Sequence, residues 1–411
     1  MSLSEDLTWR GLIKDKTFNS DKWLDKPRTF YHGVDASSDS MTIGNLAAML
    51  MARRLIDAGW QAVLLAGGAT SLIGDPKETE ERELKPREEI KKNVAAVKAQ
   101  INQLFAGKQF TLVDNYDWFK EVGYLDFLRE VGKNFAMSEL MQREFVTERL
   151  DSGISYAEFS YSLIQGYDYW QLYKKHKTEL QVGGSDQWGN MLSGVSLIRK
   201  KEAKEVQALS MPLVIDKSTG RKFGKSEDGA IWLDPERTSI FKFYQFWYNT
   251  ADEDAGEYLK IFTLLDKPEI ESLIDEQKQN PAKRVAQKRL ALEVTKLVHD
   301  DDQAAKQQRI SEALADERGV EDLNDAEVAT LREEMPTAAV QPGSSIIDVL
   351  AQTKLAGSNS EARRLLESKS IYLNGQKVEK SHLEAADFKN GLLMLRRGKA
   401  YKDSALVELK S

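Results

Sequence analysis

Short apolar runs alternate with segments of helical periodicity through the first half of the chain. The pattern predicts extended segments at Thr29–Val34, Gln61–Ala66, Gln109–Val113 and Glu179–Val182, and an amphipathic helix at Ile43–Asp57. Glycine-rich loops follow the second and fourth of these extended segments. Such alternation is typical of an α/β fold with an open parallel sheet, in which ligands bind beyond the carboxyl ends of the strands.

The second half of the chain has a different pattern. From about Pro235 to Arg318 the periodicity is helical only, and residues 319–342 are acidic, polar and interrupted by two prolines. The remaining residues predict helices at Ile346–Leu350 and Ser360–Ser368, then a strand and hairpin turn at Ile371–Gly375. We therefore expect domains at 1–229, 230–318 and 343–411, with a linker at 319–342.

Composition narrows the class of protein. A chain of 411 residues is too long for one ordinary domain. It has no cysteine, which excludes disulfides and thiolate metal sites, and its four histidines are widely scattered, which argues against a protein-bound metal. The apolar runs are too short to span a bilayer, and the first residues are acidic where a signal peptide is basic. We expect a cytoplasmic protein without a membrane partner.

Charge is unevenly distributed along the chain. The net charge is −7, yet residues 343–411 contain 12 Lys and Arg against 8 Asp and Glu. A basic tail on an acidic body fits contact with RNA or DNA, and it also fits ordinary scatter. Charge alone leaves both interpretations open.

Two glycine-containing segments could carry chemistry. The segment Gly67–Asp75 lacks the Gly-Lys-Ser/Thr that ends a phosphate-binding P-loop, so its simplest interpretation is a structural turn. In the segment Arg221–Ser226, two lysines lie on either side of a flexible glycine. Both ammonium groups could reach one polyphosphate, although a basic surface loop would look the same.

Several motifs carry a resemblance to one family. The segment Lys222-Phe223-Gly224-Lys225-Ser226 resembles the K-M-S-K-S loop of class I aminoacyl-tRNA synthetases, and Thr42-Ile43-Gly44-Asn45 lies where that class has H-I-G-H. The segments Asn115–Trp118, Tyr161–Asp168 and Gly183–Asn190 are similar to those of bacterial tyrosyl-tRNA synthetases. The resemblance extends from about Trp9 to the C-terminus, where residues 343–411 resemble an S4-like RNA-binding domain.

The resemblance implies an architecture and an activity. It implies a Rossmann-like parallel-sheet catalytic domain, an all-helical domain and a small α+β S4-like domain. The implied reaction activates L-tyrosine with ATP, which carries Mg²⁺ on its phosphates, and transfers the tyrosyl group to tRNA(Tyr). It also implies a homodimer, and no DNA partner.

The resemblance also assigns site residues. The i, i+4, i+7 spacing of Tyr161, Gln165 and Asp168 places them on one helix face, either as a ligand site or as a structural hydrogen-bonded network. The residues implied for tyrosine are Tyr31, Asp75, Asn115, Tyr161, Gln165, Asp168 and Gln181. Those implied for ATP are Gly33, Asp35, Gly44, Gly184, Asp186, Gln187, Lys222 and Lys225, although Asp186 could equally be a helix N-cap. Those implied for catalysis are Lys222, Lys225, Thr42, Asn45 and Ser37, and those for RNA are Arg363, Arg364, Lys377 and Lys354.

The chain departs from the family pattern in its first signature. Thr42 and Asn45 replace two histidines, and Ser37 lies where threonine is usual. A threonine hydroxyl is shorter than an imidazole, so it reaches a phosphate less easily. His32 could compensate, but we expect a packing residue. The loop after Asp75 lacks the family's Gly-Lys, which leaves Lys77 and Arg82 as alternatives for pyrophosphate.

These departures define a rival hypothesis. The chain could be a paralogue that binds tyrosine or RNA as a regulator without charging tRNA. The presence of both signature lysines and of the tyrosine-site residues favours the enzyme.

Overall fold

The computed structural model describes residues 1–76, 83–142, 146–147, 153–215, 229–315, 319–398 and 403–410, and the backbone of 225–226. These residues form two compact units. The first contains residues 1–239 and 250–290, and the second contains residues 240–249 and 291–411. The expected all-helical domain at 230–318 is therefore divided between the two units.

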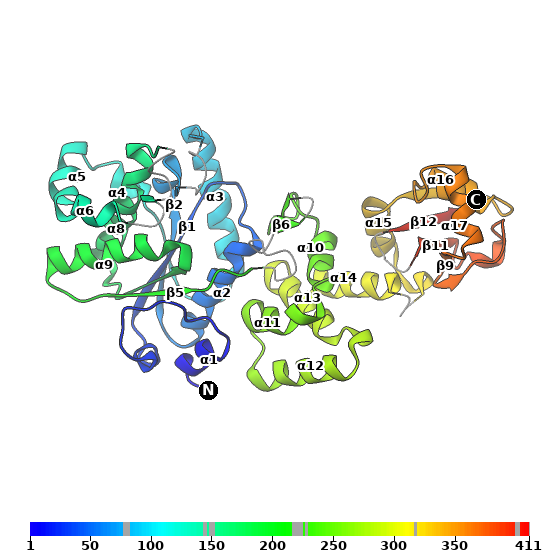
Figure 1. Cartoon of the computed structure of the whole chain (residues 1–411), viewed down its shortest axis with the longest axis horizontal. Helices are drawn as coiled ribbons and strands as arrows, with labels where there is room; N and C mark the ends of the chain where they lie inside the picture. Colours follow the sequence, from blue (N-terminus) through cyan, green and yellow to red (C-terminus); the bar gives the residue numbers. More distant parts are fainter. Residues whose placement is uncertain are drawn as a thin grey trace. The chain divides into compact units, whose positions relative to one another are not determined.

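A five-stranded parallel sheet forms the centre of the first unit, in the order β3-β2-β1-β4-β5. The strands are β1 (Thr29–Asp35), β2 (Gln61–Gly67), β3 (Thr111–Asp114), β4 (Leu180–Gly184) and β5 (Gln207–Met211). Figure 1 shows α2 (Ile43–Asp57) and α3 (Arg87–Leu104) on one side of the strands, and α8 (Tyr156–His176) and α9 (Trp188–Glu202) on the other. This confirms the expected Rossmann-like arrangement.

Shorter elements complete the first unit. They are α1 (Leu3–Trp9), α4 (Tyr116–Phe119), α5 (Tyr124–Glu130), α6 (Met137–Leu140), the short strands β6 (Lys225–Ser226) and β7 (Gly229–Ala230), α11 (Asp252–Phe262) and α12 (Lys267–Gln279). The helix α13 (Val285–Val298) is divided between the two units at Leu290. None of the described helices combines the length and the apolar character that a bilayer span requires.

The second unit combines helices with a mixed sheet of order β10-β9-β11-β12-β8. Its helices are α10 (Ile240–Tyr248), α14 (Asp301–Leu314), α15 (Asp325–Glu334), α16 (Ile346–Gln352) and α17 (Asn359–Glu367). Its strands are β8 (Thr337–Val340), β9 (Ile371–Leu373), β10 (Gln376–Lys377), β11 (Leu392–Arg397) and β12 (Ser404–Leu409). The turn between β9 and β10 has positive φ at Asn374 (45°) and Gly375 (79°), as a tight hairpin requires.

The structure corrects the expectation of a linker at 319–342. The segment contains α15, which begins with a capping box between Asn324 and Glu327, and β8, which pairs in parallel with β12. Val328 and Leu331 are buried in a core shared with α14, β11 and β12. The prolines that suggested a linker lie at the two ends of β8, where they interrupt no pairing.

Candidate active site

A cavity of about 450 Å³ lies at the carboxyl ends of β1 and β4. These two strands pair in register only at Phe30–Leu180 and Tyr31–Gln181, although both continue further. The strand order reverses here, since β2 and β3 lie on one side and β5 on the other. Open α/β sheets bind ligands at such a switch point.

One end of the cavity holds a buried carboxylate. Asp168, which is 2% exposed, accepts hydrogen bonds from Asn115 Nδ2 (3.0 Å) and Trp118 Nε1 (2.9 Å). Burial raises the pKa of Asp168 to about 8, although both hydrogen bonds act in the opposite direction. The nearby Tyr31 hydroxyl is buried and has no hydrogen-bond partner among the described residues. A ligand hydroxyl placed here could satisfy both groups.

A second group of polar side chains lies along the same cavity. Tyr161 donates to Asp35 Oδ2 (2.8 Å), and Asp75 accepts from Gln187 (2.7 Å) and Asn190 (3.2 Å). Burial, together with the charge of Asp35, raises the pKa of Tyr161. The sequence assigns Gln187 to ATP, and the structure places its amide on Asp75. Two carboxylates held in this way suit a ligand ammonium group.

The remaining lining residues include most of the expected nucleotide and catalytic positions. The cavity is bordered by Gly33, Ser37, Thr42, Gly44, Asn45, Gly184 and Asp186, as well as by Gln165 and Gln181 from the expected tyrosine set. Asn115 reaches the site through Asp168. The structure therefore brings all the described candidates of the first unit to one place, which confirms that Tyr161, Gln165 and Asp168 share one helix face.

The first signature forms a local hydrogen-bonded unit at the start of α2. The Thr42 backbone N–H (3.0 Å) and the Thr42 hydroxyl (3.1 Å) both donate to Asn45 Oδ1. The amide oxygen of Asn45 is thereby held, and its NH₂ group is the end that can turn toward a substrate. Thr42 therefore orients Asn45.

Backbone hydrogen bonds join the first signature to residues 231–233, which follow the second signature at 222–226. The Ile43 N–H donates to Ile231 O (3.1 Å), and the Leu233 N–H donates to Met41 O (2.9 Å). The backbone of Lys225 pairs with Ala230, which borders the cavity. Lys222, the side chain of Lys225, Lys77 and Arg82 lie outside the described residues.

His32 is buried, as expected, and it also borders the cavity. Its Nδ1 lies 3.0 Å from Val182 O, and because a carbonyl oxygen only accepts, Nδ1 carries the proton. Burial lowers the pKa of His32, so the ring is neutral near pH 7.

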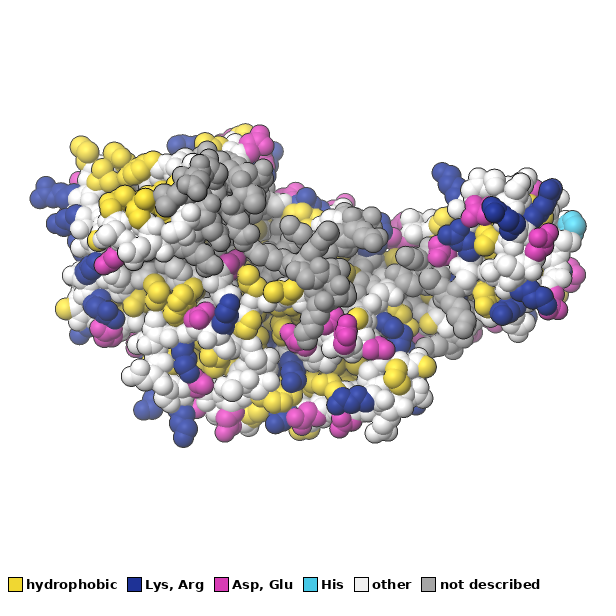
Figure 2. Space-filling view, viewed as in Figure 1, with side chains coloured by type: hydrophobic (Ala, Val, Ile, Leu, Met, Phe, Trp, Pro, Cys, Tyr) yellow, Lys and Arg dark blue, Asp and Glu magenta, His cyan; other side chains and the backbone are white. Residues whose placement is uncertain are grey.

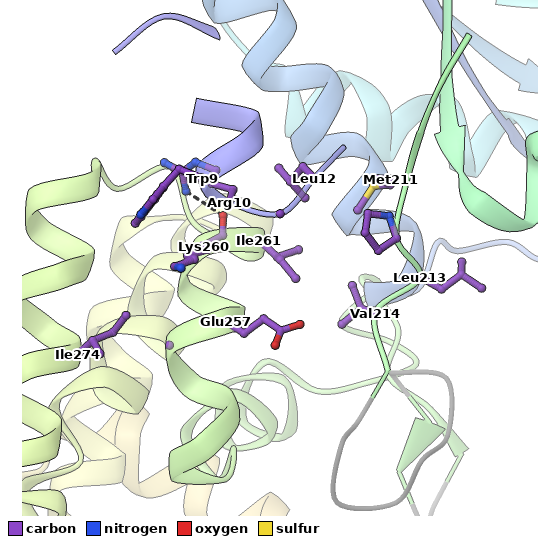
Figure 3. Close-up of a pocket in the computed structure, with 13 residues that line it drawn as sticks. Trp9, Arg10, Leu12, Met211, Leu213, Val214, Glu257, Lys260, Ile261 and Ile274 are labelled. Atoms are coloured by element: carbon purple, nitrogen blue, oxygen red, sulfur yellow. Dashed lines mark hydrogen bonds between the residues drawn. The ribbon is translucent and has the colours of Figure 1, made fainter. Parts of the chain in front are cut away.

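A second cavity of about 430 Å³ shares a wall with the first. It lies between Trp9 and Leu12, the face of α11, and the segment Met211–Val214, which borders both cavities (Figure 3). The Arg10 guanidinium donates to Lys260 O (2.8 Å) and Leu265 O (2.6 Å) beside it. This cavity contains none of the residues assigned from the sequence.

The expected RNA-binding residues lie on the surface of the second unit. Arg363 and Arg364 on α17, Lys377 on β10 and Lys354 after α16 are all exposed. Leu365 and Leu366 of α17 are partly buried and pack against the core of this unit.

Sequence reasoning missed several residues of the site. Thr70, Trp118 and Asn190 make hydrogen bonds to its carboxylates. His32, for which packing was preferred over a compensating role, also borders the cavity. Trp118 lies three residues after Asn115 in a motif that the sequence had singled out, so the motif itself was the available signal. Within the described part of the chain, no three His, Asp or Glu side chains are grouped as a metal site requires.

Comparison with known proteins agrees with this geometry. The family model of class I tRNA synthetases (W and Y) matches residues 24–315, and that of the tyrosine–tRNA ligase SYY-like C-terminal domain matches residues 327–402. Tyrosine–tRNA ligase 1 of Enterococcus faecalis is 43% identical over 92% of each chain. The tyrosine–tRNA ligase of Leuconostoc mesenteroides is 39% identical over 97% of this chain and 98% of its own.

Solved structures give the same result. A C-terminally truncated mitochondrial tyrosyl-tRNA synthetase of Aspergillus nidulans superposes with a TM-score of 0.68 at 31% identity, over 76% of this chain and 94% of its own. The Archaeoglobus fulgidus tyrosyl-tRNA synthetase complexed with L-tyrosine shares the fold, with a TM-score of 0.56 at 14% identity, over 75% of this chain and all of its own. The chain belongs to the class I tRNA synthetases of the tryptophan and tyrosine group.

Proposed function

We propose that the chain is a tyrosine–tRNA ligase: it activates L-tyrosine with ATP and transfers the tyrosyl group to tRNA(Tyr). The observation that carries the choice of substrate is the buried pair of Tyr31, whose hydroxyl has no partner among the described residues, and Asp168. A phenol hydroxyl can donate to Asp168 and accept from Tyr31. Bound phenylalanine would leave the Tyr31 hydroxyl and the Asp168 carboxylate without this hydrogen-bond partner, which lowers its binding free energy relative to that of tyrosine.

The rest of the site supports the first half-reaction. Tyr161, Gln165 and Asp75 line the side of the cavity proposed for the ammonium group, and Gln181 borders the same pocket. Gly33, Gly44, Gly184 and Asp186 are proposed for ATP, and Asp35, which accepts from Tyr161, is proposed for both the ammonium group and ATP. A Cβ at position 184 would lie 2.5 Å from Asp186 Oδ1, so any side chain there would displace the Asp186 carboxylate from its present position.

The chemistry needs no nucleophile from the protein. The tyrosine carboxylate attacks the α-phosphorus of ATP and pyrophosphate leaves, so the protein contributes positioning and charge stabilisation. Asn45, oriented by Thr42, together with Ser37, Lys222 and Lys225, is proposed to act on the phosphates. The substrate is ATP with Mg²⁺ on its phosphates. The tyrosyl group then passes to the terminal ribose of tRNA.

The test is tyrosine-dependent ATP–pyrophosphate exchange without tRNA, with phenylalanine as the control amino acid. We expect exchange with tyrosine and at least about a hundredfold less with phenylalanine. Absence of exchange in a protein that binds tyrosine by calorimetry would contradict the proposal, and it would favour the rival regulator.

A homodimer is proposed on an apolar surface of the first unit. Tyr124, Leu125, Met137 and Tyr156 are 64%, 77%, 59% and 61% exposed, and Figure 2 shows hydrophobic side chains gathered over the α4–α6 end of the molecule. An exposed patch of this kind marks an interaction site. The proposed occupant is a second copy of this chain, and a cytoplasmic location stays a prediction.

Sedimentation tests this surface. Leu125→Glu places a charge at its most exposed residue, so we expect it to weaken association at least about tenfold. Lys91→Glu, at an exposed position of α3, is the control and leaves the sedimentation coefficient unchanged. A monomeric wild-type protein at micromolar concentration would contradict the assignment.

A further inference from the structure

A chain of buried hydrogen bonds connects the two ends of the proposed tyrosine site. Asn115 Nδ2 donates to Asp168 Oδ2 (3.0 Å) and to Thr70 Oγ1 (3.1 Å), and the Thr70 hydroxyl donates to Asp35 Oδ1 (2.6 Å). Asp35 also accepts from Tyr161. This hydrogen-bonded network therefore connects Asp168, at the end of the site proposed for the tyrosine hydroxyl, with Asp35, at the end proposed for the ammonium group.

The members of this chain have little freedom to rearrange. Asn115 is 0% exposed and Thr70 is 3% exposed. The Asn115 amide uses both of its N–H groups as donors, and its Oδ1 accepts from the Ala69 N–H (2.6 Å). Turning the amide over would direct its oxygen at a carboxylate, so its orientation is fixed. The Thr70 hydroxyl must then accept from Asn115 and donate to Asp35.

Gly67 makes room for this hydrogen-bonded network, and Gly68 makes room for the neighbouring Asp114. A Cβ at Gly67 would lie 2.3 Å from Thr70 Oγ1 and 2.5 Å from Asp35 Oδ1, and a Cβ at Gly68 would lie 2.4 Å from Asp114 Oδ1. Both glycines have negative φ, so the need for glycine comes from close approach. This explains the glycine pair, which the sequence assigned only to a structural turn.

We propose that Thr70 is a positioning residue that couples recognition of the tyrosine ammonium group to recognition of the tyrosine hydroxyl. The proposal rests on the proposed function, which places the hydroxyl at Asp168 and the ammonium group near Tyr161 and Asp35. Thr70 borders the cavity, and its hydroxyl is hydrogen-bonded to Asp35 on one side and Asn115 on the other, through which it is proposed to act.

The coupling follows from the charges at the two ends. Asp35 and Asp168 are both acidic, and the charge of Asp35 is among the causes that raise the pKa of Asp168. A ligand ammonium group at Asp35 offsets that charge. Asp35 then accepts less strongly from the Thr70 hydroxyl, and Thr70 in turn accepts less strongly from Asn115. Asn115 then donates more fully to Asp168, and both effects favour the ionised carboxylate, which accepts a ligand hydroxyl better than the protonated carboxyl does. The hydroxyl therefore contributes more when the ammonium group is present.

Four ligands measure this coupling. L-Tyrosine, L-phenylalanine, 3-(4-hydroxyphenyl)propionate and 3-phenylpropionate differ only in the hydroxyl and the ammonium group. Their dissociation constants, from calorimetry or from competition against tyrosine-dependent exchange, form a thermodynamic cycle. We expect the ammonium group to increase the contribution of the hydroxyl about tenfold in the wild type.

The variants separate coupling from stability. Thr70→Val keeps the shape and removes the hydroxyl, so we expect the coupling to fall to within about twofold of none. Thr70→Ser keeps the hydroxyl and should restore it. Thr178→Val is the matched control, because Thr178 is buried beside β4 and its hydroxyl has no partner among the described residues. If Thr70→Val does not fold, Thr70→Ala replaces it.

Two results would overturn the proposal: an unchanged coupling in Thr70→Val, or a wild-type protein without coupling. Failure of the proposed function is distinguishable from both. Equal binding of L-tyrosine and L-phenylalanine by the wild type would remove the role of Asp168 itself. A preference for tyrosine without coupling would remove only the role of Thr70.

Discussion

At the scale of single residues, the buried carboxylate of Asp168 makes the stability of the protein depend on pH. The pKa of Asp168 rises from 3.8 to about 8 because the carboxylate is buried, so between these values the folded chain holds a proton that the unfolded chain has lost. The contribution of Asp168 to stability is therefore highest at low pH and falls as the pH rises toward 8.

Asp168→Asn tests this prediction. The variant lacks this titration. Its free energy of unfolding, relative to that of the wild type, should therefore increase as the pH rises from 5 to 8, by at most about 1.4 kcal/mol per pH unit. The altered hydrogen bonds of the variant add a constant, and only the slope is diagnostic. Denaturant unfolding at several pH values measures it, and a flat difference would contradict the buried titration.

The first signature offers a second prediction for single residues. Because the Thr42 hydroxyl donates to Asn45, Thr42→Val should lower the rate of pyrophosphate exchange by about tenfold through loss of Asn45 orientation. Thr42→Ser is the matched control and keeps the rate. In an Asn45→Ala background Thr42→Val should have no further effect, whereas additive losses would show that Thr42 contacts the substrate itself.

Among the elements, α2 is anchored by a buried arginine. Arg54 Nη2 donates to the carbonyls of Lys260 (3.1 Å), Ile261 (3.1 Å) and Thr263 (2.5 Å) at the end of α11. Burial, reinforced by the positive charge of Arg10, lowers the pKa of Arg54 to about 9. The carbonyls at the end of a helix carry partial negative charge, so two arginines are well placed there.

Removal of this anchor should destabilise the first unit. Arg54→Met removes the guanidinium donor of Ile261 O and leaves Lys260 O and Thr263 O with Arg10 alone, and we expect a loss of about 2–4 kcal/mol in the free energy of unfolding. Lys91→Ala at an exposed position of α3 should change it by less than about 0.5 kcal/mol. Equal melting temperatures for Arg54→Met and the wild type would contradict the anchor.

The sequence predicted the regular elements well where local patterns decide them. The bounds of α2 agree at both ends, and the hairpin turn follows from Asn374 and Gly375. The strand β5 was missed, because its residues Gln207–Met211 show no marked alternation. The segment 319–342 was misinterpreted, because its polar composition hides the few apolar residues, Val328 and Leu331 among them, that decide its packing.

The candidate site shows the same limit. Motif residues such as Asp168 and Tyr161 were found, since the resemblance carries them. The links between them were not, because Thr70 lies 45 positions from Asn115 and 35 from Asp35, and contacts at such separations leave no local pattern.

The cavity and the cations expected to bind RNA lie in different units of the molecule. The exposed arginines Arg363 and Arg364 lie in the second unit, and the cavity lies in the first. The double variant Arg363→Ala, Arg364→Ala should weaken tRNA binding. It should also reduce the slope of the logarithm of the binding constant against the logarithm of the salt concentration, by up to about two. Tyrosine-dependent exchange should keep its wild-type rate.

Filter binding over a salt series measures the affinity. Lys389→Ala, another exposed cation of the same unit, is the control. An unchanged salt slope in the double variant would exclude α17 from the RNA surface.

The setting of Asp168 also bears on redesign of the pocket for tyrosine analogues with other para substituents. Replacing Asp168 by an apolar residue would leave the Trp118 indole N–H and an Asn115 N–H as buried donors without an acceptor. A library that varies position 168 alone would thus consist mainly of damaged proteins. Functional variants require compensating changes at positions 115 and 118 together with the change at 168. A change of substrate specificity through successive single substitutions is therefore obstructed.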